Sequence, residues 1–105
     1  MNKPNSVYIT TKNKAEAERI GRALVQERLA ACVNIIDGMN SIYRWEGKIQ
    51  EDKEAVLIAK TKQSLVKKLT NRVKSLHSYS CPCIISLPIL GGNKDYLDWL
   101  SKETR

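Results

Sequence analysis

The chain contains no phenylalanine, a single histidine and only six aromatic residues, all of them tyrosine or tryptophan. No apolar run approaches the roughly 18 residues that a membrane span requires, so we expect no membrane partner. The opening stretch MNKPNSVYITTKN lacks both the apolar segment of a signal peptide and the arginine-rich pattern of a transit sequence, which predicts a cytoplasmic protein. Glycine and proline, at five and three residues, indicate no linker or low-complexity segment.

The usual catalytic combinations are also missing. With one histidine, and with no glycine-rich loop leading into a helix, neither a serine–histidine–aspartate triad nor a phosphate-binding loop has its context. We therefore predict that the protein is not an enzyme. The three cysteines are an odd number in a chain without an export signal, which favours reduced thiols over a disulfide framework.

Acidic residues are absent from one long segment. No aspartate or glutamate occurs between Ala55 and Lys94, whereas that segment carries seven lysines and arginines, the source of most of the net charge of +7. A surface of one sign attracts anions, and a basic helix could dock an acidic surface. The more ordinary alternative is a solvated helix face. Nucleic acid is the least favoured partner, because no aromatic side chains interleave with the basic ones as a stacking surface requires.

The 105 residues fit one domain, residues 1–105, and their patterns predict an α+β fold. Strands are predicted at 6–11, 30–37 with an extension through 40–45, 48–61 and 83–90, and helices at about 14–29, 62–76 and 94–103. The order βαββαβ, followed by a short C-terminal helix, is that of a ferredoxin-like fold, in which two helices cover one face of an antiparallel sheet.

Several residues are predicted to set local geometry. Asn13 followed by Glu16 resembles a capping box, and Thr61 is expected to cap the second helix. Gly21 would let a strand approach the first helix closely, and Pro88 belongs at a strand end or sheet edge. The residues expected to face inward are Ala17, Ile20, Leu24 and Val25 in the first helix, and Leu65, Val66, Leu69, Val73 and Leu76 in the second.

The second and third strands form an unusually long hairpin around a turn at Glu46-Gly47. Residues 30–37 are apolar enough to be buried on both faces. The outer half of the hairpin, residues 40–54, could not be covered by so small a domain. We therefore expect it to contact another subunit.

Five stretches together resemble the CutA family, which is named for tolerance to divalent cations. They are Glu27–Ile35, Ser41–Ile49, Ala55–Thr61, Leu76–Pro82 and Leu87–Leu100. The resemblance implies a ferredoxin-like domain assembled into a homotrimer, with long hairpins joining the subunits, and a role in tolerance to divalent metals such as copper. The family also resembles the PII signalling proteins in its trimeric architecture.

One stretch departs from the family pattern. Where a typical member has a sequence like H-P-Y-E-V-P-E-I, this chain has H-S-Y-S-C-P-C-I from His77 to Ile84. Both carboxylates are lost, and with them the hard oxygen ligands and any general acid or base that they offer. Two soft thiols are gained.

His77, Cys81 and Cys83 form the pattern H-x3-C-x-C, a candidate metal site. In an extended segment, residues two apart point to the same side, so both thiols could meet one ion. Sulfur with imidazole suits Cu(I) or Zn(II). A fourth ligand would be water, another subunit or Cys32, whose family counterpart is also a cysteine with a proposed role in metal binding. The alternative is that all three cysteines only pack. We expect no obligatory cofactor, with copper or zinc as the candidate metals.

The resemblance also places Trp45, Lys60, Tyr79 and the region of Trp99, together with His77, near clefts between subunits. Such a cleft could hold a small anionic ligand, with Lys60 and His77 supplying positive charge and the aromatic rings supplying walls. For each aromatic side chain taken singly, packing is the more ordinary interpretation. Three hypotheses remain: a CutA-type tolerance protein that binds soft metal, a PII-like regulator, and a scaffold whose basic helix docks an acidic surface.

Overall fold

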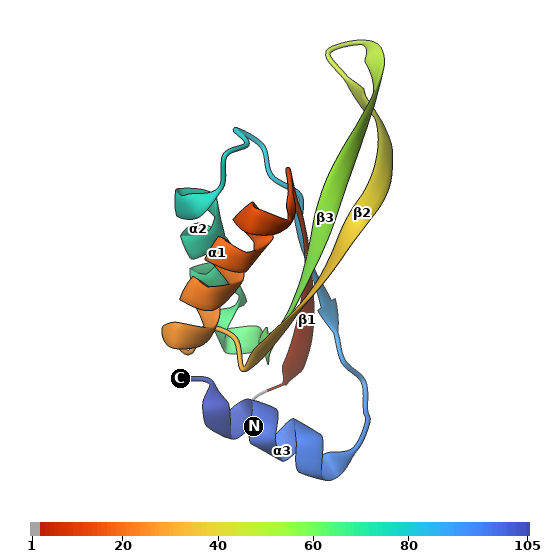
Figure 1. Cartoon of the computed structure of the whole chain (residues 1–105). Coiled ribbons are helices and arrows are strands. Elements are labelled where there is room, and N and C mark those ends of the chain that lie inside the picture. Colours follow the sequence, from red (N-terminus) through yellow and green to blue (C-terminus); the bar gives the residue numbers. More distant parts are fainter. Residues whose placement is uncertain (1–2) are drawn as a thin grey trace.

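The computed structural model describes residues 3–105 (Figure 1). Its elements are β1 (Pro4–Thr11), α1 (Lys14–Gln26), β2 (Cys32–Trp45), β3 (Lys48–Lys62), α2 (Val66–Leu76), β4 (Ile84–Pro88) and α3 (Lys94–Glu103). The strands form one antiparallel sheet in the order β2-β3-β1-β4. Helices α1 and α2 lie on one side of this sheet, and α3 lies at the end opposite the hairpin tip (Figure 1). The α+β class and the order βαββαβ with an added C-terminal helix are thus confirmed.

Helix α1 begins where the sequence predicts. Asn13 is its N-cap, and the Asn13 side-chain oxygen accepts a hydrogen bond from the Glu16 N–H at 2.9 Å. The return bond of a capping box is displaced by one residue, because Glu16 Oε1 accepts from the Lys12 N–H at 3.0 Å. Glu16 therefore takes part in the N-cap through its N–H, and its carboxylate also binds the backbone of Lys12, which precedes the helix.

Helix α1 ends at Gln26, before the predicted end near Leu29. Leu29 N–H donates to the Leu24 carbonyl at 2.9 Å, the outer bond of a Schellman motif. Arg28 turns the chain with a φ of 58°, a conformation that usually selects glycine. Its guanidinium donates to the carbonyls of the last two residues of α3 at 2.8 and 3.2 Å. This arginine thus joins the end of α1 to the end of α3.

The core lies between the sheet and helices α1 and α2. Its buried residues are Val7, Ile9, Ala17, Ile20, Leu24, Leu29, Ala30, Ala55, Leu57, Ala59, Leu65, Leu69 and Val73. A Cβ on Gly21 would lie 3.0 Å from Val33 Cγ2 and 3.3 Å from Leu57 Cδ1, so the missing side chain allows the predicted close approach of helix to sheet. Val25 is 39% exposed, and its placement on the buried face is wrong because it lies at the rim of α1.

The opposite face of the sheet carries no helix. Strand pairing places Tyr8 beside both Ile58 and Ile85. Because side chains alternate between the two faces along a strand, these three point away from the core. Ile85 and Leu87 on edge strand β4 are about half exposed, as is Ile36 on edge strand β2. We call these five residues the open face. The prediction that residues 30–37 are buried on both faces is wrong for the single chain, because no helix covers the open face on which Ile36 lies.

The β2–β3 hairpin extends well beyond the rest of the molecule (Figure 1). Glu46 and Gly47 form its two-residue turn, and both have positive φ, at 50° and 78°. This is the type I′ geometry that matches the twist of the strands, and it confirms the predicted turn. A register shift near Gly38, whose φ is 72°, bends the hairpin. Residues 42–53 are all exposed in the single chain.

Helix α2 begins at Val66 rather than at Lys62, because β3 continues to Lys62 and a 3₁₀ turn, Gln63–Leu65, follows. The prediction that Thr61 caps this helix is wrong. Thr61 Oγ1 instead donates to the Leu29 carbonyl at 2.6 Å, in a buried hydrogen bond that joins β3 to the segment after α1. The Thr61 hydroxyl thus makes a long-range hydrogen bond to Leu29 instead of the local capping bond that the sequence predicts.

The outward face of α2 is basic, as predicted. Lys67, Lys68 and Lys74 are exposed. Arg72 differs, because its guanidinium donates to both oxygens of the Glu27 carboxylate at 2.8 to 3.0 Å and so links α2 to α1. One of the four charges on this helix therefore acts within the chain.

The remaining elements agree with the sequence. Helix α3 has the predicted bounds, and Pro88 is the last residue of edge strand β4, where its missing N–H costs no ladder bond. Among residues 3–105, no helix combines the length and the apolar character that a membrane crossing requires.

Candidate functional site

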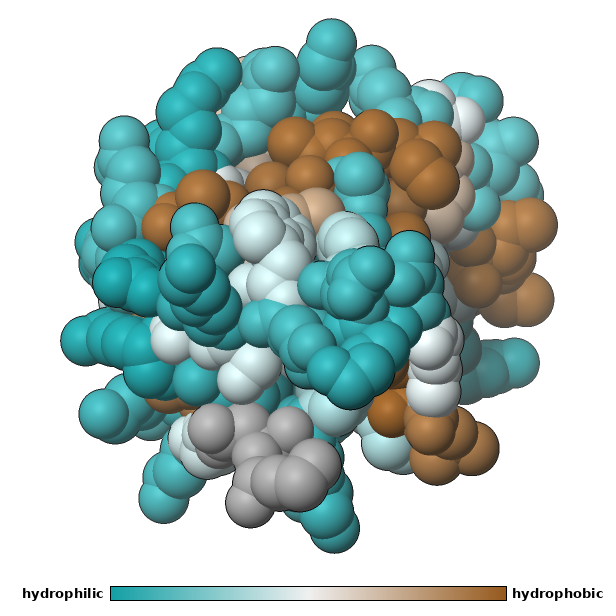
Figure 2. All heavy atoms as spheres, turned by 90° about the horizontal axis from the view of Figure 1, so that it is seen from below, coloured by the Kyte–Doolittle hydropathy of each residue, from teal (hydrophilic) through white to brown (hydrophobic). Residues whose placement is uncertain are grey.

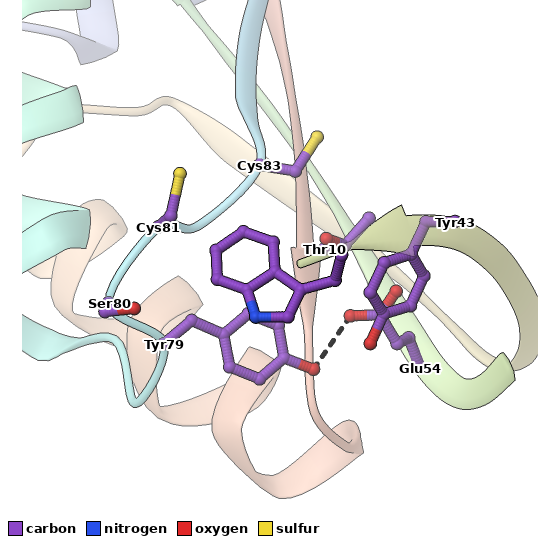
Figure 3. A pocket seen from close by; sticks show the side chains of 8 residues that line it. Thr10, Tyr43, Glu54, Tyr79, Ser80, Cys81 and Cys83 are labelled. Atoms are coloured by element: carbon purple, nitrogen blue, oxygen red, sulfur yellow. Dashed lines mark hydrogen bonds between the residues drawn. The ribbon is translucent and has the colours of Figure 1, made fainter. Parts of the chain in front are cut away.

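A cavity of about 330 Å³ lies where the loop after α2 meets the β2–β3 hairpin and the end of β1 (Figure 3). We call it the hairpin cavity. Thiols, hydroxyls, aromatic rings and one carboxylate line it, from Thr10, Tyr43, Trp45, Glu54, Tyr79, Ser80, Cys81 and Cys83. Of these residues, Trp45, Tyr79, Cys81 and Cys83 are predicted from the sequence, whereas Thr10, Tyr43, Glu54 and Ser80 are not.

His77 holds the loop through both of its ring nitrogens. Its side chain has no exposed surface. Nε2 lies 2.8 Å from the Thr10 carbonyl oxygen, and Nδ1 accepts a hydrogen bond from the Tyr79 N–H at 3.1 Å. Because Nδ1 accepts, these contacts assign the neutral tautomer with its proton on Nε2. Binding a metal would require His77 to give up one of the two contacts.

The Glu16 carboxylate ties the same loop to α1. Its side chain is 1% exposed, and its oxygens accept from the Lys12 N–H at 3.0 Å and from the Ser78 N–H at 2.9 Å. Arg19 Nη2 lies 3.7 Å from Oε2, and His77 Nδ1 lies 4.0 Å from Oε1. Burial alone would raise the pKa of this carboxyl. The hydrogen bonds from Lys12 and Ser78 outweigh burial, so the pKa of Glu16 lies below its ordinary value.

Two tyrosines point their hydroxyl groups at carboxylates beside the cavity. Tyr79 OH donates to Glu54 Oε2 at 2.8 Å (Figure 3), and the Tyr79 ring centroid lies 4.8 Å from that of His77. Burial and the Glu54 carboxylate raise the pKa of Tyr79, so this phenol stays protonated. Tyr43 OH makes a close hydrogen bond to Asp52, which raises the pKa of Tyr43. Neither hydroxyl is therefore a free donor for a ligand.

Cys81 and Cys83 line the cavity as free thiols. Cys81 is exposed and Cys83 is half-buried, and both sulfur atoms point away from Tyr79 (Figure 3). Burial raises the pKa of the Cys83 thiol, an effect that a hydrogen bond with Thr10 partly offsets. A metal that binds Cys83 at neutral pH would therefore displace a proton.

The four predicted metal ligands do not meet in one cluster. Cys32 lies at the start of β2, whereas the hairpin cavity is lined by residues near the end of that strand. Both ring nitrogens of His77 already contact the backbone, at Thr10 and Tyr79. Across residues 3–105, no group of three or more histidine, cysteine, aspartate or glutamate side chains is placed to hold a metal ion. A complete site would need ligands beyond Cys81 and Cys83. Uptake of metal by these thiols stays a prediction.

Cys32 belongs to a second group of side chains at the base of the hairpin. Lys60 Nζ lies 3.8 Å from Cys32 Sγ and also contacts Asn34 Oδ1. Tyr96 OH lies 3.6 Å from the same sulfur, and its ring centroid is 5.5 Å from that of Trp99. The hydrogen bond with Cys32 raises the pKa of Tyr96. An ammonium, a thiol and two aromatic rings are thus gathered where β2, β3 and α3 meet.

Comparison with known proteins supplies the family. The model of the CutA1 divalent ion tolerance protein matches residues 5–103. The chain belongs to the CutA1 family. The chloroplastic CutA protein of Arabidopsis thaliana is 50% identical over 99 residues, which are 94% of this chain and 54% of that relative. The divalent-cation tolerance protein CutA of Thermus thermophilus is 52% identical over 98 residues, 93% of this chain and 95% of the relative.

Solved CutA1 structures share the fold. The divalent cation tolerance protein of T. thermophilus aligns with a TM-score of 0.95 at 50% identity, over 97% of this chain and 99% of that structure. The resemblance drawn from the sequence is therefore confirmed. This chain spans about half the length of the first plant relatives it matches, at 54% and 56%. Both are named chloroplastic, and the cytoplasmic location of this chain stays a prediction.

The cleft residues that the CutA resemblance suggests divide between the two groups. Trp45 and Tyr79 line the hairpin cavity, whereas Lys60 and Trp99 lie with Cys32 at the base of the hairpin. One CutA1 chain does not bring the four together. Contact between subunits would be needed to bring these four side chains together.

Proposed function

We propose that this CutA1-family protein contributes to divalent-cation tolerance as a non-enzymatic homotrimer that takes up soft metal through Cys81 and Cys83, Cu(I) before Zn(II). One observation carries the proposal: both thiols line the same cavity. The family description and the name of the Thermus relative support the link to divalent-cation tolerance.

The donor set favours copper over zinc. Sulfur ligands select soft ions over Mg²⁺ and Ca²⁺, and structural zinc sites are closed by four ligands. Beside its two thiols the cavity offers one carboxylate, that of Glu54, which already accepts from Tyr79. This set falls short of four, whereas Cu(I) accepts two or three. Because burial raises the pKa of Cys83, uptake strengthens as the pH rises and the thiol loses its proton more readily.

Exposed apolar surface supports the homotrimer. A single chain leaves large apolar side chains uncovered on the open face and on the hairpin, among them Ile36, Ile42, Ile49, Ile85 and Leu87. Viewed from the α3 end, hydrophobic side chains gather in patches within a mainly hydrophilic surface (Figure 2). Large apolar side chains left exposed in this way mark an interface, and association with further copies of the chain would cover them.

Native mass spectrometry of reduced protein titrated with Cu(I) and Zn(II) tests the metal site. We expect one Cu(I) per chain in the wild type and none in the Cys81→Ser/Cys83→Ser double variant. The matched control is Cys32→Ser, which removes a thiol outside the cavity and should keep the copper. Loose, non-stoichiometric uptake by the wild type, or unchanged uptake by the double variant, would mean that both cysteines only pack and bind no metal.

A second candidate function rests on the group around Lys60. An ammonium and a pair of aromatic rings gathered around Cys32 are a combination that suits a small anionic ligand, as in a PII-like regulator whose sites lie between subunits. ATP, as a probe of this chemistry, should bind the wild type and lose at least tenfold in affinity in Lys60→Ala, measured by calorimetry. The double thiol variant should bind ATP normally. Equal binding by wild type and Lys60→Ala would remove this candidate.

A further inference from the structure

The hairpin cavity contains no basic residue, although the chain as a whole carries a net charge of +7. Its one carboxylate is that of Glu54, which is only 8% exposed. None of the ion pairs among residues 3–105 includes Glu54, so its carboxylate has no cationic partner in that part of the chain. A carboxylate held in such surroundings without a counter-ion is costly, and a bound cation would offset that cost.

One oxygen of Glu54 remains available from the cavity. Tyr79 OH donates to Oε2, the one hydrogen bond that the structure gives to this side chain within residues 3–105. In the same part of the chain, no side-chain oxygen or nitrogen is both fully buried and without a partner. Oε1 must therefore reach solvent, and a ligand in the cavity can contact it.

Aromatic rings supply the rest of the wall. Tyr43, Trp45 and Tyr79 all line the cavity, and in the single chain the first two are 41% and 47% exposed. Ring faces carry partial negative charge and attract ammonium groups within about 6 Å. The two phenol hydroxyls already donate to Asp52 and Glu54, so they offer no hydrogen for an anion. This chemistry favours a positive ligand over a negative one.

We propose that the hairpin cavity binds a small organic cation, an alkylated ammonium, with Glu54 as counter-ion and with Tyr43, Trp45 and Tyr79 as walls. A volume of about 330 Å³ is at the lower end of the range for ligand pockets, which fits a small molecule. The site goes beyond the proposed metal function, because it needs neither thiol of Cys81 and Cys83. It also differs in charge preference from the group around Lys60.

Calorimetry on the reduced, metal-free full chain tests the site with choline and with its uncharged carbon isostere, 3,3-dimethylbutan-1-ol. We expect choline to bind at least tenfold more tightly than the isostere, since only the charge differs. Glu54→Gln should weaken choline binding at least tenfold, and it keeps an oxygen that accepts from Tyr79 OH. The matched control is Glu51→Gln, an exposed residue of the same strand outside the cavity, which should leave affinity unchanged.

A second variant keeps the test independent of folding defects. In the single chain Trp45 lies next to the hairpin turn and is 47% exposed, so Trp45→Ala should leave the fold of the chain intact and still lose most choline affinity. Choline binding is measured on metal-free protein and copper uptake in a separate titration, so that failure of the metal proposal and failure of this one are distinguishable. No choline binding at millimolar concentration, equal binding of the isostere, or full binding by both Glu54→Gln and Trp45→Ala would overturn the proposal.

Discussion

Replacing Glu16 by alanine is expected to lower the free energy of unfolding by about 2 to 3 kcal/mol. The substitution leaves the N–H groups of Lys12 and Ser78 without their acceptor. The loop that carries the thiols would then be attached to α1 less firmly. Urea unfolding at pH 7 measures the effect, at one fixed protein concentration because an oligomer's stability depends on it.

Glu18→Ala is the matched control for this effect. Glu18 lies on the same helix with the same charge, but it takes part in none of the ion pairs found within residues 3–105. Its replacement should change the free energy of unfolding by less than about 0.5 kcal/mol. Equal losses in both variants would mean that Glu16 acts only as a negative charge near the start of α1.

The pH dependence of the Glu16 effect has a definite sign. The pKa of Glu16 is lower in the folded chain than its ordinary value of 4.5, so the unfolded chain binds the proton more readily. The stability that Glu16 supplies is therefore complete above that value and is lost as the pH falls below it, through the folded pKa. The difference in stability between wild type and Glu16→Ala should shrink accordingly. A difference that stays constant down to pH 3 would contradict this assignment.

Features determined by neighbouring residues could be predicted from the sequence. Asn13 and Glu16 mark the start of α1 because a cap needs only its own first turn. Glu46-Gly47 marks the hairpin turn because a type I′ turn needs two residues with positive φ. Thr61 shows the limit of such reasoning, since its best partner is the Leu29 carbonyl, supplied by a distant part of the chain.

The candidate site depends on contacts that no local pattern contains. The sequence groups His77 with Cys81 and Cys83 because they are close in the chain. The imidazole instead turns toward the Thr10 carbonyl, 67 residues away. Glu54 gives no local sign of its role, because its partner Tyr79 comes from the loop after α2. Which side chains meet in the hairpin cavity is decided by how that loop packs against the hairpin.

Replacing Ile85 by aspartate is expected to convert the proposed trimer into single chains. Ile85 lies on the open face beside Tyr8, where 52% of it is exposed in one chain. If further copies cover this face, the aspartate would be buried there without a partner, which weakens association by a factor on the order of 100 or more. Light scattering after size exclusion should give three times the 11.9 kDa chain mass for the wild type, and one chain mass for the variant.

The fold of the single chain should survive this change, which makes the result interpretable. In one chain Ile85 is half exposed and contributes nothing to the core, so the circular dichroism spectrum of Ile85→Asp should match that of the wild type. Lys68→Asp is the control, since Lys68 is exposed on α2, and α2 covers the other face of the sheet. It should remain a trimer despite a larger change in charge. A wild-type mass for Ile85→Asp would show that the subunits meet elsewhere, because an interface of dry apolar side chains cannot hold three unpaired carboxylates.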